Sequence, residues 1–297
     1  MNFVDWVWQS YESLRFFKEQ KNKQVNLLTG SGLYMPEGGL EFAFVPTASL
    51  KVLEDRIKSL YETITIEEHK VDVCSEVFFT TKIEGAKTTI ERTQQLHNGK
   101  PIDMSNAFSE YMVLGAFNAT KLLNIRGNKV SHKILREVWE ALTFGCCENA
   151  DIEGVLYRNG NVQVGNHVGC PVPLLYDAMD NWLTFYTSKE LDEYPFIKAA
   201  LLHYSFEYIH PFCDGNGRMG RLLMNNFLIG KGYEKIKAVS FSKKIDENRT
   251  AYDFAFMQSE NVYSDCTAFL TYMLQQMLGA LEDIVQDTDL ISITDNI

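Results

Sequence analysis

The chain has 297 residues, 45% of them apolar and 23% charged, which is the composition of a globular protein with one large domain or a domain and a subdomain. Its formal net charge of −11 disfavours binding to a phosphate backbone, so we expect no nucleic-acid partner. The N-terminus lacks a basic region followed by an apolar run, no stretch approaches the ~20 apolar residues of a membrane span, and the six cysteines show no C-x-x-C spacing. We therefore expect a cytoplasmic protein with reduced thiols and no membrane partner.

Helices dominate the first half of the chain. Residues 3–24 have a helical pattern, and the glycine- and proline-rich stretch 28–49 predicts a loop with a short extended piece at 42–45. Apolar residues at spacings of three and four then predict further helices. These helices are expected over residues 49–64, about 68–84, 104–124, and 131–145 with Ser131 as N-cap.

A hairpin and a second run of helices follow. Asn159-Gly160 next to alternating valines predicts a β-hairpin within 152–172. Helices are then expected over about 173–187, 193–209, 218–230, 246–258 and 264–284, with a frayed end in the last dozen residues. The predicted fold class is mainly α: a helical core with one β-hairpin and an N-terminal helical extension.

One segment of twelve residues, 210–221, gathers the chemistry, and its sequence is HPFCDGNGRMGR. Pro211 disfavours helical geometry at His210, so the preceding helix is expected to stop there. The Gly215-Asn216-Gly217 turn allows positive φ values, and successive N–H groups in such a turn form an anion-binding nest. A new helix is expected near Arg218, and its first N–H groups also favour an anion.

The side chains of this segment complement such an anion. Arg218 and Arg221 lie three apart, and planar guanidinium groups match phosphate oxygens. Asp214 offers the hard oxygen ligand that Mg²⁺ prefers, and His210 is a titratable base at the rim. No packing requirement explains a base, a carboxylate, a nest and two guanidinium groups within so short a segment.

This segment resembles the Fic family motif H-P-F-x-[D/E]-G-N-G-R-x-x-R at every specified position. The resemblance extends to the family's flap region and to the run after the motif, through Gly154, Tyr157, Arg158, Val162, Pro173 and Leu222-Leu223-Met224-Asn225. It implies a Fic (Fido) core over about 104–275. Residues 1–103 would then be an N-terminal extension, and 276–297 a C-terminal helix end and tail.

The resemblance implies a protein adenylyltransferase that moves AMP from ATP to a Ser, Thr or Tyr hydroxyl of a protein target. His210 would be the general base, and Asp214 would hold Mg²⁺ on the ATP phosphates. Phe212 would anchor the loop, and the flap near 158–169 would pair with an extended target segment. The implied nucleotide ligands are Gly215, Asn216, Gly217, Arg218, Arg221 and Asn225.

A second, shorter pattern lies upstream. Thr80, Glu84 and Gly85 match the family's inhibitory pattern [S/T]-x-x-x-E-[G/N], as in the branch with an N-terminal inhibitory helix, here at about 72–84. Thr80 and Glu84 are four apart, so they share one helix face, and Gly85 suits a helix end. The implied inhibition is a salt bridge from Glu84 to Arg221, which would occupy the guanidinium that the γ-phosphate needs.

Other functions stay open at this level. Removal of AMP from a modified protein and transfer of another nucleotide-linked group both lie within the family's range. An ATP-responsive binding module needs neither a base nor a metal ligand, so His210 and Asp214 disfavour it. Glu207, one turn before His210, could orient that histidine or face solvent. The sequence leaves open the target, which could be the chain itself, the preferred nucleotide, the role of residues 1–48, and whether the protein forms the homodimer that the resemblance suggests.

Overall fold

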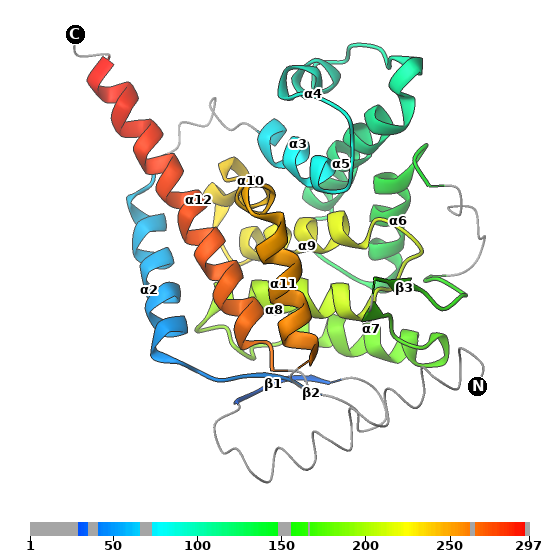
Figure 1. Cartoon of the computed structure of the whole chain (residues 1–297), viewed down its shortest axis with the longest axis vertical. Helices are drawn as coiled ribbons and strands as arrows, with labels where there is room; N and C mark the ends of the chain where they lie inside the picture. Colours follow the sequence, from blue (N-terminus) through cyan, green and yellow to red (C-terminus); the bar gives the residue numbers. More distant parts are fainter. Residues whose placement is uncertain are drawn as a thin grey trace.

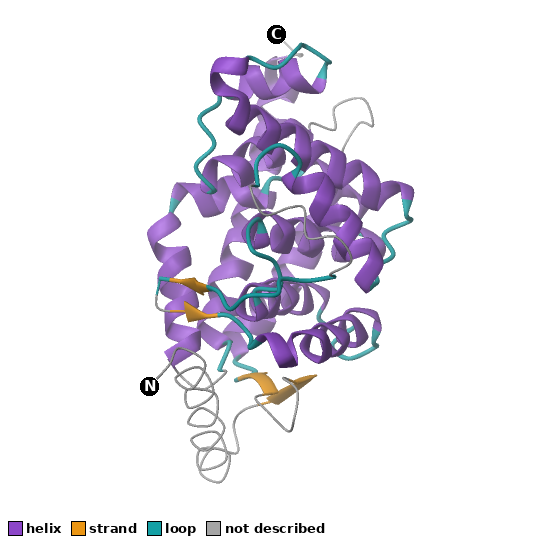
Figure 2. Cartoon of the chain, turned by 90° about the vertical axis from the view of Figure 1, so that its right-hand side faces the viewer, coloured by secondary structure: helices purple, strands orange, loops and turns teal. Residues whose placement is uncertain are grey.

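The computed structural model describes residues 29–34, 41–65, 73–147, 156–165, 167–261 and 265–294. The predicted helix at 3–24 and the flap residue Gly154 lie outside these ranges. The described part is mainly helical, with two small antiparallel sheets of two strands each, as Figures 1 and 2 show. The predicted fold class is therefore confirmed.

The first sheet lies where the sequence predicted mostly loop. Strand β1 (Thr29–Tyr34) pairs with β2 (Glu41–Phe44), so the extended piece was placed correctly but the strand before it was missed. The reason is tertiary, because the ring of Phe42 is fully buried and packs edge-on against Tyr204 and Tyr208. Helix α2 (Ala48–Thr63) follows, with the Thr47 side chain accepting from the amide of Leu50.

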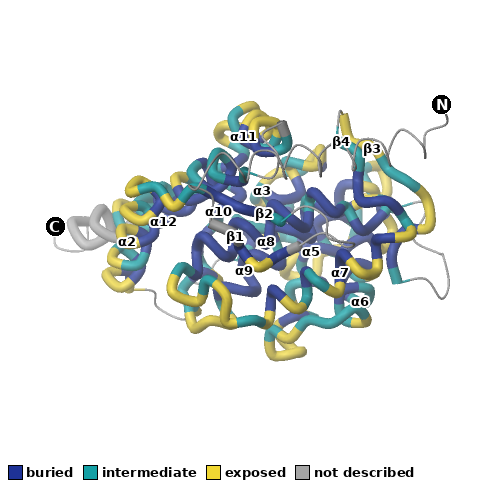
Figure 3. The backbone as a smooth tube through the Cα atoms, turned by 90° about the horizontal axis from the view of Figure 1, so that it is seen from below, coloured by how far each residue is buried: buried dark blue, intermediate teal, exposed yellow. Residues whose placement is uncertain are grey.

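Helix α8 (Pro195–Ile209) forms the centre of the molecule. Nearly every residue of α8 is buried, as expected for a helix that is apolar all round and has neighbours on every side. Helix α9 (Asn216–Gly230) makes its most extensive contact with α8. Helices α7 (Val172–Thr187) and α12 (Thr267–Thr294) also pack on α8. Figure 3 shows the buried residues at the centre and the exposed ones around the periphery.

The helices between α2 and α7 cover another side of this centre. They are α3 (Val73–Ile83), α4 (Ile90–His97), η2 (Met104–Asn106), α5 (Ala107–Ile125) and α6 (His132–Thr143). The predicted cap of α6 is confirmed, because the Ser131 side chain accepts from the Ile134 amide at 3.2 Å. The short helix α4 was not predicted, although its N-cap Thr89 accepts from the Arg92 amide in the expected way.

Two helix boundaries differ from the prediction at the C-terminal end. A 3₁₀ turn, η3 (Glu234–Ala238), precedes α10 (Phe241–Glu247), and α11 (Arg249–Asn261) begins after a break at Asn248. The single helix predicted at 246–258 is therefore two helices. Helix α12 continues to Thr294, beyond its predicted end at 284, so most of the segment that was predicted to be frayed is helical.

The second sheet is the predicted hairpin, with a different turn. Strand β3 (Gln163–Val164) pairs with β4 (His167–Val168), and the chain reverses after Gly165, which has a φ of 59°. The turn predicted at Asn159-Gly160 was wrong, because these residues lie before the strands. Asn-Gly there is part of a bend that Arg158 holds, by donating to the carbonyl of Gly160 at 2.7 Å.

Within the described residues, no helix combines the length and the apolar character needed to cross a membrane. All six cysteines lie in this part of the chain, and none forms a disulfide.

The contact between α5 and α6 depends on Gly115. A Cβ at Gly115 would overlap the carbonyl oxygen of Leu142, which is backbone and cannot turn aside. We expect Gly115→Ala to lower the free energy of unfolding by about 1–3 kcal/mol in urea denaturation. Gly279→Ala in α12 is the control, since its Cβ would meet only the flexible Lys244 side chain at 3.6 Å. Equal stability of the two variants would contradict this account of the α5–α6 contact.

Candidate active site

His210 lies directly after the buried helix α8. Its φ of 53° is left-handed, and its amide donates to the Phe206 carbonyl at 2.9 Å to close the helix. The predicted helix stop is therefore correct. The ring atom Nδ1 lies 3.3 Å from the Glu207 carbonyl oxygen, which suits a tautomer with the proton on Nδ1 and leaves Nε2 as the base.

The loop after His210 is held by packing and by its own hydrogen bonds. The ring of Phe212 is buried and stacks on Trp139, with centroids 5.0 Å apart. The Asn216 side chain accepts from the Phe212 amide and donates to the Phe212 carbonyl, both at 2.9 Å. Trp139 Nε1 donates to the Asp214 carbonyl at 2.8 Å. Phe212 thus has the surroundings of a loop anchor, and Asn216 offers a ligand its backbone, since its side chain closes the loop.

The start of α9 faces the same side as His210. Gly215 has a φ of 78°, which favours glycine, and α9 begins at Asn216, two residues before the predicted start. The first amides of a helix have no acceptor within it, so they are directed at any group placed at this end. This is the geometry of an anion site.

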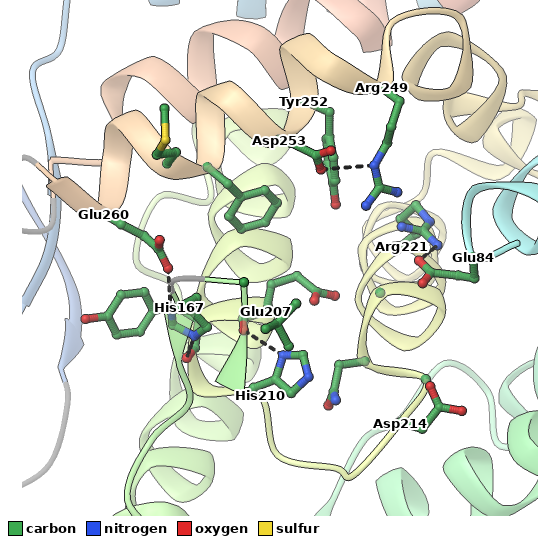
Figure 4. Close-up of a pocket in the computed structure, with 18 of the residues that line it drawn as sticks. Glu84, His167, Glu207, His210, Asp214, Arg221, Arg249, Tyr252, Asp253 and Glu260 are labelled. Atoms are coloured by element: carbon green, nitrogen blue, oxygen red, sulfur yellow. Dashed lines mark hydrogen bonds and ion pairs between the residues drawn. The ribbon is translucent and has the colours of Figure 1, made fainter. Parts of the chain in front are cut away.

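Arg221 is buried and held by the end of α3. Its Nε donates to the Thr80 hydroxyl at 2.8 Å, and its Nη2 donates to the Thr80 carbonyl at 3.1 Å and to Glu84 Oε1 at 2.7 Å. Gly85, with a φ of 91°, then leads the chain away from α3. The predicted contact between Glu84 and Arg221 is therefore present in the structure, and Figure 4 shows it at one end of a cavity.

The electrostatics favour charge on both groups. Burial acts to raise the pKa of Glu84, but the charge and hydrogen bond of Arg221 outweigh it, so the pKa lies below its usual value. Burial acts against the Arg221 cation, and the Glu84 charge raises the pKa of that guanidinium. Gly217 allows the close approach, because a Cβ there would overlap Glu84 Oε1.

Asp214 and Arg218 have contrasting positions. The Asp214 side chain is 51% exposed and lines the cavity, and its Oδ2 lies 3.4 Å from Arg218 Nη2. The Arg218 guanidinium is buried behind the loop, near the Leu142 carbonyl and Cys146 Sγ. Asn225 is also buried and is not among the cavity-lining residues. Of the predicted catalytic, metal-binding and nucleotide-binding residues, the cavity therefore brings together all but Arg218 and Asn225.

The carboxylate of Asp214 is suited to bind a cation together with a nucleotide. It is solvent-accessible and, among the described residues, makes one long ion pair, so its oxygens are open to a ligand. No group of three or more potential metal ligands occurs among the residues that the structure describes. This donor set fits Mg²⁺ carried by a nucleotide, which takes one or two carboxylates and completes its shell with phosphate oxygens and waters.

The cavity has a volume of about 590 Å³, and one of its walls was not predicted. The motif loop forms one wall and helix α11 the opposite one. Val164, Gly165 and His167 of the hairpin lie at the cavity, and His167 forms an ion pair with Glu260 of α11. In the sequence, α11 showed only a regular helical periodicity, so its place as a wall of the cavity was not predicted. Its lining residues are Arg249, Tyr252, Asp253, Phe256, Met257 and Glu260.

Glu207 and the buried His203 lie close together at the wall of the cavity. The Glu207 carbonyl, not its carboxyl group, contacts His210, and Glu207 Oε1 has no hydrogen-bond partner among the described atoms. Burial raises the Glu207 pKa to about 8. His203 is buried, with its Nε2 2.8 Å from the Tyr252 hydroxyl. Gly220 leaves room for both, since a Cβ there would lie 2.6 Å from His203 Nδ1 and 2.8 Å from Glu207 Oε1.

Burial, followed by the charge of His167, lowers the pKa of His210 to about 4. The imidazole is thus neutral at pH 7, the state that a proton acceptor requires. A neutral base therefore stands at one end of the cavity, the amides of α9 and a half-exposed carboxylate lie along the motif loop, and a buried guanidinium stands at the other end.

Sequence comparison assigns this geometry to a family. Residues 130–228 match the model of the Fic/DOC family, and this segment contains the whole motif. The chain carries a Fic/DOC domain. It is 30% identical over 200 residues to the protein adenylyltransferase Fic of Drosophila ananassae, covering 63% of this chain and 39% of that protein. It is 34% identical over 170 residues to that of Drosophila grimshawi, covering 54% and 34%. The chain thus spans well under half the length of these curated relatives.

Solved structures show the same fold at lower identity. A Fic family protein from Desulfovibrio desulfuricans superposes with a TM-score of 0.72 and 21% identity, over 82% of this chain and 76% of that one. Fic-1 (residues 134–508) from C. elegans gives a TM-score of 0.66 and 20% identity, over 82% and 72%. These likenesses extend the Fic fold well beyond the segment that the family model matches.

The lowered pKa of His210 predicts how the stability of this Fic domain depends on pH. An unfolded histidine binds a proton near pH 6.5, whereas folded His210 stays neutral to about pH 4. Between these values the unfolded state binds more protons, so this residue makes the folded state less stable as the pH falls. His210→Asn removes this contribution, and asparagine tolerates the left-handed φ. From pH 7 to 4.5, urea denaturation should show a smaller loss of stability for the variant. Parallel losses would contradict the lowered pKa.

Proposed function

We propose that this chain is a protein adenylyltransferase that transfers AMP from ATP to a Ser, Thr or Tyr hydroxyl of a protein. The curated relatives at 30–34% identity bear that name. The observation that carries the proposal is the arrangement of His210, Asp214, the start of α9 and Arg221 around one cavity. A base at one end and a guanidinium at the other suit an acceptor hydroxyl and a triphosphate.

The neutral His210 would act as the general base. Its Nε2 takes the proton of the acceptor hydroxyl while that oxygen attacks the α-phosphorus of ATP. A new P–O bond to the target forms, the bond between the α-phosphorus and the bridging oxygen breaks, and pyrophosphate leaves. Because Nδ1 is engaged with the Glu207 carbonyl, the ring is already oriented for this transfer.

The phosphates would lie along the motif loop. The amides of Gly215, Asn216 and Gly217 would bind phosphate oxygens, and Arg221 would bind the γ-phosphate once Glu84 has left. Asp214 would hold Mg²⁺, which neutralises phosphate charge when bound. Arg218 and Asn225 remain predicted nucleotide ligands, and both lie behind the cavity wall in this structure.

The hairpin β3–β4 would receive the target. Its main chain borders the cavity beside His210, so an extended target segment paired with it would bring a hydroxyl to the base. Such pairing requires little of the target's side chains, which is compatible with self-modification. We also propose that the Fic core spans about 104–275, that the protein is cytoplasmic and that it forms a homodimer.

In the state described by the structure, the site would be inhibited. Glu84 holds the Arg221 guanidinium at 2.7 Å and adds a negative charge where a γ-phosphate would approach. A triphosphate has to displace this carboxylate, so Glu84 would lower both the affinity for ATP and the fraction bound productively.

We expect Glu84→Gly to raise AMP transfer at least about fivefold, the lower end of typical coupling between sites. The variant frees the Arg221 guanidinium without touching the base. Incorporation of labelled AMP with Mg²⁺, followed by mass spectrometry of the adduct, is the measurement. Glu84→Gln, which keeps the shape and loses the charge, should lie between wild type and Glu84→Gly. Flat or reduced incorporation in both variants would refute the inhibitory role.

We expect His210→Ala in the Glu84→Gly background to lose ~10²–10⁴-fold in transfer rate, because a general base supplies that factor. ATP binding by calorimetry should persist, since the α9 amides and Arg221 are unchanged. His210→Asn, which fits the left-handed backbone, controls for distortion of the loop. If both variants lose ATP binding, the histidine is structural and not the base.

A further inference from the structure

Helix α3, which leads to Glu84, packs against several helices, and α10 is the most important of them. The contact of α3 with α10 is more extensive than its contacts with α4, α5 or α9. Figure 1 shows α3 beside α10, with α5 on its other side. After the break at Asn248, α10 is followed by α11, which forms a wall of the cavity.

The polar part of this attachment centres on Glu76, in the first turn of α3. One carboxyl oxygen, Oε2, accepts from the Ser240 hydroxyl and from the Ser242 amide, both at 3.0 Å. The other, Oε1, accepts from the Ser242 hydroxyl at 2.6 Å. Both carboxyl oxygens therefore have protein donors, and all of these belong to the start of α10.

The second polar contact between these helices is weaker. Lys82 Nζ lies 2.7 Å from Asp246 Oδ2, but the lysine side chain is 47% exposed. Exposed ion pairs contribute little because water and salt screen them. Glu76 instead makes three hydrogen bonds at a partly buried position, where removal of the acceptor leaves three donors without this partner.

Glu76 and Glu84 act on opposite ends of one short helix. They are eight residues apart, about 12 Å along a helix axis at 1.5 Å per residue. Glu76 holds the first turn of α3 against α10, and Glu84 lies just past the last turn, against Arg221. A rotation or shift of α3 at its start would therefore move Glu84 relative to the guanidinium.

We propose that Glu76 is a positioning residue for inhibition: its hydrogen bonds to Ser240 and Ser242 hold α3 where Glu84 meets Arg221. This rests on the proposed function, in which Glu84 restrains the site. Release of α3 would return the Glu76 carboxyl group and the serine donors to water, so the attachment is reversible. The occupancy of Arg221 by Glu84 would then depend on a contact remote from the nucleotide.

The test compares full-length Glu76→Ala with wild type and Glu84→Gly. The matched control is Glu54→Ala. Glu54 likewise accepts from backbone amides at a helix start, those of Phe196 and Ile197, and this helix is α8, not α10. Labelled AMP incorporation, ATP affinity and hydrogen exchange of residues 73–83 are the readouts, with thermal unfolding to confirm that each variant is folded.

We expect Glu76→Ala to raise incorporation by ~5–100-fold, with tighter ATP binding and faster exchange in α3. Combining it with Glu84→Gly should give no more than about twice the activity of Glu84→Gly alone, because both changes free the same guanidinium. Glu76→Gln, whose amide can still pair with the serine hydroxyls, should stay near wild type. Glu54→Ala should not raise activity.

Unchanged hydrogen exchange in α3 of Glu76→Ala overturns the proposal whatever the activity. So does activity of that variant at or below the wild-type level when Glu84→Gly is activated. If Glu84→Gly itself is not activated, the inhibitory role fails, and exchange in α3 still decides whether Glu76 holds the helix. Should Glu76→Ala not fold, Ser242→Ala replaces it, with a smaller increase in exchange and activity expected and no increase contradicting the proposal.

Discussion

The site depends on the burial of one full positive charge. The Arg221 side chain is 1% exposed, and a guanidinium in that setting requires an anionic partner, because unpaired buried charge is strongly destabilising. In the structure Glu84 and Thr80 supply the partners. A triphosphate could supply them instead. In the proposed function, inhibition and substrate binding are alternative ways to satisfy the same buried cation, so one contact would control the site.

A few contacts also fix the conformation of His210 and of the loop that follows it. His210 closes α8 in a left-handed conformation. Arg158, which precedes the hairpin, donates to the His210 carbonyl oxygen at 2.7 Å. Phe212 stacked on Trp139 and the Asn216 side chain fix the turn that follows. The loop is rigid because its own polar groups are satisfied internally, which leaves the α9 amides for a ligand.

The attachment of α3 adds a second level to this arrangement. Glu76 binds the start of α10, and α10 is followed by α11, whose residues face the motif loop across the cavity. Helix α3 and the α11 wall of the cavity therefore both adjoin α10.

Local sequence was enough to find most of the long helices, the cap at Ser131, the stop at His210 and the group of chemical residues at 210–221, because each depends on neighbours within a few positions. The four-residue spacing of Thr80 and Glu84 likewise placed both on one face. The strand β1, the break at Asn248, the hairpin turn at Gly165 and the α11 wall were decided by tertiary structure. They arise from contacts between distant segments, such as Phe42 with Tyr208, and no local pattern encodes them. The internal use of the Asn216 amide and the burial of Arg218 also became visible only once the chain was folded, since side-chain partners depend on packing.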